Sequence, residues 1–332
     1  MKPSDLSEYL AFSIKNNFPV LITGAPGIGK SDIVEQACTK ADVKLIISHP
    51  VVADPTDYKG LPFPSQDGSV ADFLPYGDLD KLIKADEPTV FFLDDLGQAA
   101  TSVQAACMQL ILARRINGHK VSDKIIFLAA TNRKQDKAGV TGIIEPVKSR
   151  FDIQELTPNL KDWSKWAYDN GMPHELITFV NFQPDLLLIH QTTIDISNSS
   201  SPRTIAAVGR KQNCNCPTNL FYDSCKGTAG EVFARQYIAF LELFKTLPTV
   251  DSILMNPKSA KIPPTLDTTY AFTVALARRM TDTNISSICE YLERLEPELS
   301  VCCMKMATAR DKSLEETAAF SRWAANISSE LL

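Results

Sequence analysis

The fold is decided by the stretch Gly24-Ala25-Pro26-Gly27-Ile28-Gly29-Lys30-Ser31, which fits the phosphate-loop pattern GxxxxGK[S/T]. An apolar run, residues 19–23, precedes it as a buried strand would, and residues 32–41 follow with apolar side chains at helical spacing. Glycines let successive backbone N–H groups turn toward one anion at the positive end of a helix. The stretch therefore predicts a strand, loop and helix that bind a nucleoside triphosphate, and an ordinary glycine-rich turn is the alternative.

All eight residues of this stretch are predicted to contact the nucleotide. Lys30 would reach the β- and γ-phosphates, and Ser31 would be a ligand of Mg²⁺. A second signal is the run Val90–Leu93, which leads directly into Asp94 and Asp95. A buried strand delivers carboxylates in this way to its C-terminal edge, beside a bound phosphate.

Each of the following polar residues has a predicted role and an alternative. Asp94 should hold the magnesium shell, and Asp95 should polarise the attacking water, unless Asp95 is an ordinary helix N-cap. Asn132 directly follows the apolar run Ile125–Thr131 and could position that water; the alternative is a turn-forming asparagine.

The composition fits a chain of two or three domains, with 332 residues of which 44% are hydrophobic. The net charge of −5 is mild and no Lys/Arg block is long, so nucleic acid is not indicated. No apolar run approaches the roughly 18 residues of a membrane span, and the N-terminus does not have the pattern of an export signal. We therefore expect a cytoplasmic protein without a membrane segment.

The order of patterns along the chain predicts an α/β domain followed by helices. Candidate strands alternate with helical patterns and predict a five-stranded parallel sheet with flanking helices; these strands are Val20–Thr23, Val43–Ser48, Thr89–Asp94, Ile125–Thr131 and Ile153–Leu156. One helix, Gln98–Arg115, is expected to leave Gln104 and Gln109 outside. Later helices are expected at Glu231–Thr246, Thr268–Met280, Ile285–Leu295 and Leu314–Leu331.

These segments together resemble the AAA+ ATPases, and the chain looks like a member of their MoxR branch. The resemblance rests on GAPGIGKS, VFFLDD and AATN, then on residues 147–152, in the order and at the spacing of Walker A, Walker B, sensor 1 and the arginine-finger region. It implies an AAA+ P-loop core at 1–156, an α-helical lid with sensor 2 at 157–264 and a C-terminal helical region at 265–332. It also implies ATP and Mg²⁺ as cofactors.

The resemblance assigns two arginines. Arg150 is identified as the arginine finger that serves the nucleotide of a neighbouring subunit, and a salt bridge with Asp152 or another surface acid is the alternative. Arg203, in the segment Ser201–Thr204, resembles sensor 2 and would reach from the lid to the phosphates. The alternative is a solvent-facing arginine at a helix start.

The function implied by the resemblance is a ring, most often of six subunits, that hydrolyses ATP to remodel a partner protein. A partner with a von Willebrand factor A domain is the first to consider, and the segment Asp54–Tyr76 is a candidate substrate-facing loop or a simple surface connection. Two other functions stay open: a nucleic-acid motor or loader, and a slow-hydrolysing assembly switch. The switch is kept because most relatives have Asp-Glu where this chain has Asp94-Asp95. The sequence does not decide between ATP and GTP.

A metal site of a different kind is conceivable at Cys214, Cys216 and Cys225, with His190 as a fourth zinc ligand. Their spacing matches no recognised ligand pattern, and ordinary thiols in a loop insertion are the alternative. The other cysteines are scattered, which favours reduced thiols over a disulfide framework.

Overall fold

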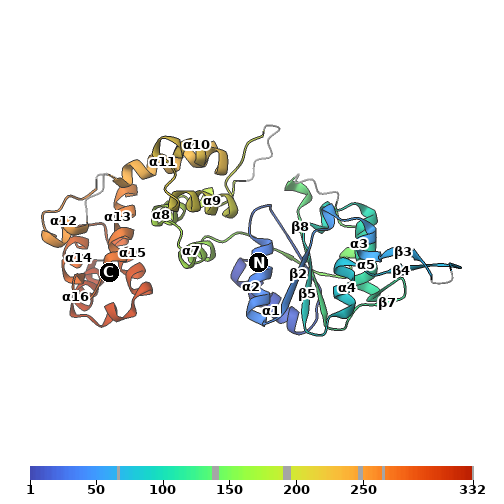
Figure 1. The fold of residues 1–332 in the computed structure, drawn as a ribbon. Coiled ribbons are helices and arrows are strands. Elements are labelled where there is room, and N and C mark those ends of the chain that lie inside the picture. Colours follow the sequence, from blue (N-terminus) through green and yellow to red (C-terminus); the bar gives the residue numbers. More distant parts are fainter. Residues whose placement is uncertain (66–67, 137–141, 190–195, 246–249, 264–265, 331–332) are drawn as a thin grey trace. The chain divides into compact units, whose positions relative to one another are not determined.

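The computed structural model describes residues 1–65, 68–136, 142–189, 196–245, 250–263 and 266–330 (Figure 1). These residues form two compact units, the first made of residues 1–166 and 187–207 and the second of residues 167–186 and 208–332. His190 and the C-terminal Leu331 lie outside the described residues.

The first unit is built on a five-stranded parallel sheet in the order β2-β5-β8-β1-β9. Its strands are β1 (Val20–Gly24), β2 (Lys44–Ser48), β5 (Thr89–Leu93), β8 (Ile125–Asn132) and β9 (Asp152–Glu155). The predicted parallel sheet is therefore confirmed, and each strand lies within about one residue of its expected bounds. Because all strands run the same way, the ends of β1, β5 and β8 meet at one edge.

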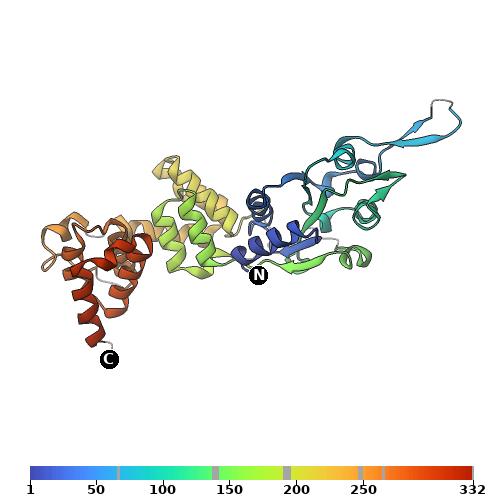
Figure 2. The same cartoon turned by 90° about the horizontal axis from the view of Figure 1, so that it is seen from below.

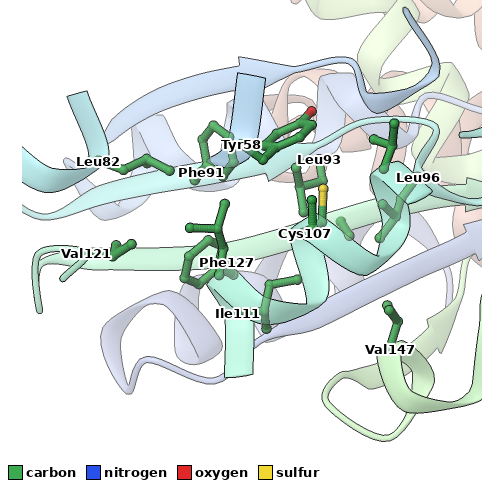
Figure 3. Close-up of a cluster of buried hydrophobic side chains, with 14 of the residues drawn as sticks. Tyr58, Leu82, Phe91, Leu93, Leu96, Cys107, Ile111, Val121, Phe127 and Val147 are labelled. Carbon is green, nitrogen blue, oxygen red and sulfur yellow. The ribbon is translucent and has the colours of Figure 1, made fainter. Parts of the chain in front are cut away.

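Helices cover both faces of the sheet (Figure 1). On one face, α1 (Pro3–Lys15) and α2 (Lys30–Ala41) pack against Val20, Phe92 and Leu128. On the other, α4 (Gly77–Lys84) and α5 (Thr101–Ala113) pack against the alternate residues of the same strands. Figure 3 shows Phe91 and Phe127 within this second cluster. Burial on both faces explains why the central strands β1, β5 and β8 are almost continuously apolar.

One prediction about α5 is wrong. Gln109 is exposed as expected, but Gln104 has 1% of its surface exposed. Its amide is buried because it bonds the backbone at three places: Nε2 donates to the carbonyls of Ala99 and Gly142, and Oε1 accepts from the N–H of Ile144.

The connection between β2 and β5 carries a two-stranded hairpin. It begins with η1 (Pro50–Val52) and α3 (Pro55–Lys59), and the antiparallel strands β3 (Leu61–Pro64) and β4 (Ala71–Leu74) follow. Both views show this hairpin extending away from the rest of its unit (Figures 1 and 2). Phe63 is 58% exposed and Val70 is 60% exposed. The candidate loop Asp54–Tyr76 is thus a structured projection with an apolar surface.

The remaining elements of the first unit are short, apart from two helices that continue into the second. They are η2 (Leu96–Gln98), β6 (Arg115–Ile116), β7 (His119–Lys120), η3 (Lys134–Asp136), α6 (Glu145–Lys148), α7 (Leu160–Asp169) and α9 (Pro202–Asn213). The short helix η4 (Pro184–Leu187) lies mostly in the second unit.

The second unit is helical. It contains α8 (His174–Phe182), α10 (Thr218–Ala229), α11 (Glu231–Lys245), α12 (Val250–Met255), α13 (Leu266–Arg279), α14 (Ile285–Leu292), α15 (Pro297–Arg310), η5 (Lys312–Glu316) and α16 (Ala318–Glu330). The last helix starts at Ala318 instead of Leu314, because Leu314 belongs to η5 and the Thr317 hydroxyl accepts from the N–H of Phe320. No helix in the described part of the chain is long and apolar enough to cross a membrane.

Candidate nucleotide-binding site

The loop Ala25–Gly29 joins the end of β1 to the start of α2, as the sequence predicts. Gly29 is the N-cap residue of α2 and offers no side-chain cap. The N–H groups of the first helical turn are therefore available to an anion, and the helix dipole favours negative charge there.

Gly27 is required by the packing of this loop. Its φ is +76°, and a Cβ at this position would lie 2.7 Å from the Ser201 hydroxyl oxygen. The Gly27 carbonyl also accepts a 3.0 Å hydrogen bond from the N–H of Arg203. The phosphate loop and the first turn of α9 are thus in direct contact.

Lys30 is buried at the centre of the site. Its Nζ donates to the carbonyls of Gly24 at 3.1 Å and Ala25 at 2.9 Å, and to Oδ1 of Asn132 at 2.6 Å. Burial lowers the pKa of Lys30 from 10.5 to about 8, although the charges of Asp95 and Asp94 oppose this change. The ammonium is therefore held without full charge compensation, ready for an anionic partner.

Ser31 and Asp94 form the candidate metal site. The Ser31 hydroxyl donates to Oδ2 of Asp94 at 2.7 Å, which brings two hard oxygen ligands together beside the phosphate loop. Mg²⁺ prefers such ligands and keeps its remaining positions for water and phosphate oxygens. These two residues therefore fit the ion that the sequence implies.

Asp95 lies next to this pair in an unusual backbone conformation. Its φ is +56°, in the left-handed region that few residues other than glycine adopt. It precedes η2, but its side chain makes no capping hydrogen bond and therefore does not act as an N-cap. Burial and the neighbouring Asp94 charge raise the pKa of Asp95, while Lys30 and Arg203 lower it. A carboxylate with a raised pKa suits a proton acceptor.

Asn132 connects the lysine to this carboxylate. Its Oδ1 accepts from Lys30, and its Nδ2 donates to Oδ1 of Asp95 at 3.4 Å. The side chain is 7% exposed and belongs to β8, so it faces inward and is not a solvent-exposed turn residue. The three residues form one polar network at the edge of the sheet.

Arg203 lies at this network and Arg150 does not. Arg203 is exposed, α9 begins one residue before it, and its charge affects the pKa values of both Lys30 and Asp95. Arg150 is also exposed, and its guanidinium lies 3.5 Å from the Ser149 hydroxyl. Within the described ranges no ion pair joins Arg150 to Asp152, which instead accepts from Tyr9 and Gln154.

Two interactions near the site were not predicted from the sequence. Arg133 follows Asn132 and makes a two-pronged ion pair with Asp136 and a 2.9 Å pair with Glu155. The spacing of three residues between Arg133 and Asp136 is a signal that could have indicated the first pair. A cavity of about 310 Å³ adjoins this arginine and is lined by the ends of β1 and β8, by β9 and by α6.

The cysteines do not gather at a metal site in the described residues. Cys214 is exposed, Cys216 is partly buried and Cys225 is buried, and no group of three or more His, Cys, Asp or Glu side chains in the described ranges could hold an ion.

Comparison with known proteins finds one family match, which lies in the core of the first unit. Residues 20–159 match the ATPase family associated with various cellular activities (AAA). This AAA domain supports an AAA+ ATPase that binds a nucleotide, and the sheet and helices have the AAA+ P-loop fold. A search of the curated proteins returns no match.

The solved structures that resemble parts of this chain include RuvB and NtrX. A RuvB mutant from Thermotoga maritima is 16% identical with a TM-score of 0.42, over 77% of this chain and 75% of that chain. NtrX from Brucella abortus in complex with ADP is 11% identical with a TM-score of 0.43, over 99% of this chain and 68% of that chain. With TM-scores below 0.5, neither likeness supports a statement about this chain.

Proposed function

We propose that this chain is a ring-forming ATPase of MoxR type whose active sites lie between neighbouring subunits. The observation that carries the proposal is the network of Lys30, Asn132 and Asp95, with the Ser31–Asp94 pair beside it. These five groups lie together within one chain, whereas the exposed guanidinium of Arg150 lies outside this network.

Each residue then has a role in phosphoryl transfer. The phosphate loop and Lys30 bind the phosphates, and Mg²⁺ held by Ser31 and Asp94 would neutralise charge on the phosphate oxygens. Asp95 accepts the proton of the attacking water, and Asn132 orients that water or the carboxylate beside it. Arg150 of a neighbour stabilises the charge that develops on the transferred group.

Hydrolysis would be coupled to movement through Arg203. Its backbone N–H donates to the Gly27 carbonyl in the phosphate loop, and it lies in the first turn of α9, which continues into the helical unit. We propose that residues 157–264 are the lid, that residues 265–332 are a C-terminal helical region, and that the lid responds to the bound nucleotide. A hexameric ring of such subunits would remodel a partner protein, with a von Willebrand factor A domain protein as the first candidate.

The hairpin β3–β4 is the part that we assign to substrate contact. Its apolar side chains are exposed, and its base is fixed to the sheet unit: His119 bonds the Phe73 carbonyl at 2.6 Å and Asn117 donates to the Lys59 carbonyl at 2.8 Å. A two-stranded ribbon gains little stability by itself, so exposed aromatic residues on it favour a binding role.

Steady-state phosphate release tests this function. Wild type should release phosphate with Mg²⁺ and ATP, whereas Lys30→Ala should not and Asp95→Asn should release it about 100-fold more slowly. Mixing Lys30→Ala with Arg150→Ala subunits should restore activity, because some interfaces then pair an intact loop with an intact finger. Inactivity of every mixture would remove the shared site from the proposal.

The slow-hydrolysing switch is retained as a second candidate because of Asp95. Aspartate is one methylene shorter than the glutamate common at this position, and its backbone is left-handed here. If wild type assembles with ATP yet releases no more phosphate than Lys30→Ala, the switch describes the protein better. Stimulation of activity by DNA or RNA, reduced by salt, would favour a nucleic-acid motor instead.

A further inference from the structure

The buried side chain of Gln104 joins two segments that the proposed reaction uses. Gln104 lies in α5 with 1% of its surface exposed. Its Nε2 donates to the Ala99 carbonyl at 3.1 Å and to the Gly142 carbonyl at 2.8 Å, and its Oε1 accepts from the Ile144 N–H at 3.2 Å. The amide thus bonds two backbone groups further along the chain, at Gly142 and Ile144, which are 38 and 40 residues away. It also bonds a third group just before α5, at Ala99.

The first of these segments begins at Asp95. The N–H of Gln98 bonds the Asp95 carbonyl at 2.9 Å, and the N–H of Ala99 bonds the Leu96 carbonyl at 3.2 Å. The Ala99 carbonyl that Gln104 holds is thus the end of a hydrogen-bonded turn that starts at the proposed proton acceptor. The backbone of Gly97 in the same turn also accepts from the N–H of Gly142 at 3.2 Å.

The second segment leads to Arg150. Ile144 precedes α6, and the N–H of Val147 bonds the Ile144 carbonyl at 2.9 Å. The N–H of Arg150 in turn bonds the Val147 carbonyl at 3.1 Å. Val147 is buried in the same cluster as Leu96 (Figure 3). The position of Arg150 therefore depends on a helix of one turn that Gln104 holds at its entry.

We propose that Gln104 is a positioning residue, which fixes Arg150 relative to Asp95 of the same subunit so that the arginine reaches the neighbour's nucleotide. The inference rests on the shared site proposed above. An apolar residue of the same size would fill the space, but it would leave the backbone groups of residues 99, 142 and 144 without this partner. The entry to α6 would then be free to shift, and a displacement near 1 Å can cost about 100-fold in rate.

The test compares Gln104→Leu with Gln109→Leu, the same substitution at an exposed position of the same helix. We expect kcat for ATP hydrolysis to fall about 10- to 100-fold in Gln104→Leu while KM for ATP stays within about twofold, because the phosphate loop is unchanged. Gln109→Leu should match wild type. A matching kcat in Gln104→Leu would overturn the inference.

Mixed assemblies separate positioning from general damage. A Gln104→Leu subunit keeps an intact phosphate loop, so mixing it with Lys30→Ala subunits, which keep intact fingers, should restore activity. In a random equal mixture about one quarter of the head-to-tail interfaces combine the two intact parts. Mixing Gln104→Leu with Arg150→Ala should restore none, because both are defective on the finger side.

Each outcome has a separate meaning. If Arg150→Ala and Lys30→Ala subunits complement each other but Gln104→Leu and Lys30→Ala do not, Gln104 does not act through the finger and the inference is overturned. If Arg150→Ala and Lys30→Ala subunits do not complement each other, both the shared site and the role of Gln104 are refuted. Should Gln104→Leu not fold, Gln104→Glu serves in its place, since it keeps the acceptor for Ile144 and loses both donors.

Discussion

Replacing Lys30 by methionine should make the stability of the nucleotide-free protein less dependent on pH. Burial lowers the pKa of Lys30 from 10.5 to about 8 in the folded protein. The unfolded chain therefore binds more protons than the folded protein between these two pH values, and the stability of wild type rises with pH there. Below pH 8 the cost of burying the charge is present in full, and above pH 10.5 it is absent.

The size of this effect follows from the two pKa values. The difference between 10.5 and about 8 corresponds to a destabilisation of about 3 kcal/mol at neutral pH. About 2 kcal/mol of it should disappear between pH 7 and pH 9.5. Lys30→Met removes the buried charge, but it also leaves the carbonyls of Gly24 and Ala25 and the Oδ1 of Asn132 without this donor. That second cost of about 1 kcal/mol for each group does not change with pH.

The assay is urea unfolding of the nucleotide-free proteins, followed by circular dichroism at several pH values. The stability of Lys30→Met relative to wild type should fall by about 2 kcal/mol as the pH rises from 7 to 9.5. Lys40→Met, at an exposed position of the same helix, is the matched control and should keep a constant difference. A constant difference for Lys30→Met as well, or one that grows with pH, would refute the account of Lys30 as a buried cation.

Three further outcomes are expected around the phosphate loop. Asp95→Asn should lower phosphate release about 100-fold with little change in binding of a nonhydrolysable analogue. In wild type, the raised pKa of Asp95 should make activity fall on acidification at a higher pH than it would with an unperturbed aspartate. A pH–rate profile without this acidic decrease would contradict the role of Asp95. Gly27→Ala should weaken nucleotide binding at least about tenfold by calorimetry, since the new Cβ would lie 2.7 Å from the Ser201 hydroxyl at a φ of +76°. Ser31→Ala should raise the Mg²⁺ concentration needed for half-maximal phosphate release several-fold, and an unchanged midpoint would exclude Ser31 as a ligand.

The sequence predicts the sheet and the phosphate loop well because both depend on local patterns. Apolar runs mark strands buried on both faces, and the glycine spacing marks the loop. The meeting of Lys30, Asp95 and Asn132 follows from the same information, since parallel strands bring their ends to one edge. Little knowledge of distant contacts is needed for this part of the site.

The features that the sequence does not predict depend on partners far along the chain. Gln104 is polar on a helix whose apolar spacing is satisfied without it, yet residues 104, 107 and 111 share a face, and the backbone at 142–144 provides its partners. The left-handed backbone of Asp95 lies at the start of the turn that follows, and the sequence pattern does not predict it. Helix periodicity reports which faces are apolar, but it does not report a buried amide that satisfies backbone groups elsewhere.

The bonds of Lys30 also bear on how the site could distinguish its nucleotide states. An ammonium has three donors, and in this structure all three are used, two by loop carbonyls and one by Asn132. A phosphate oxygen that binds Lys30 must therefore replace one of these acceptors. The bonds to Gly24 and Ala25 lie within the loop, whereas the bond to Asn132 reaches β8 and, through Nδ2, Asp95. Exchange at Asn132 is the case that would free its Oδ1 to accept a hydrogen bond from water, while its Nδ2 still donates to Asp95. Binding of phosphate at Lys30 would thus change the hydrogen bonds of the residue that contacts the proposed proton acceptor.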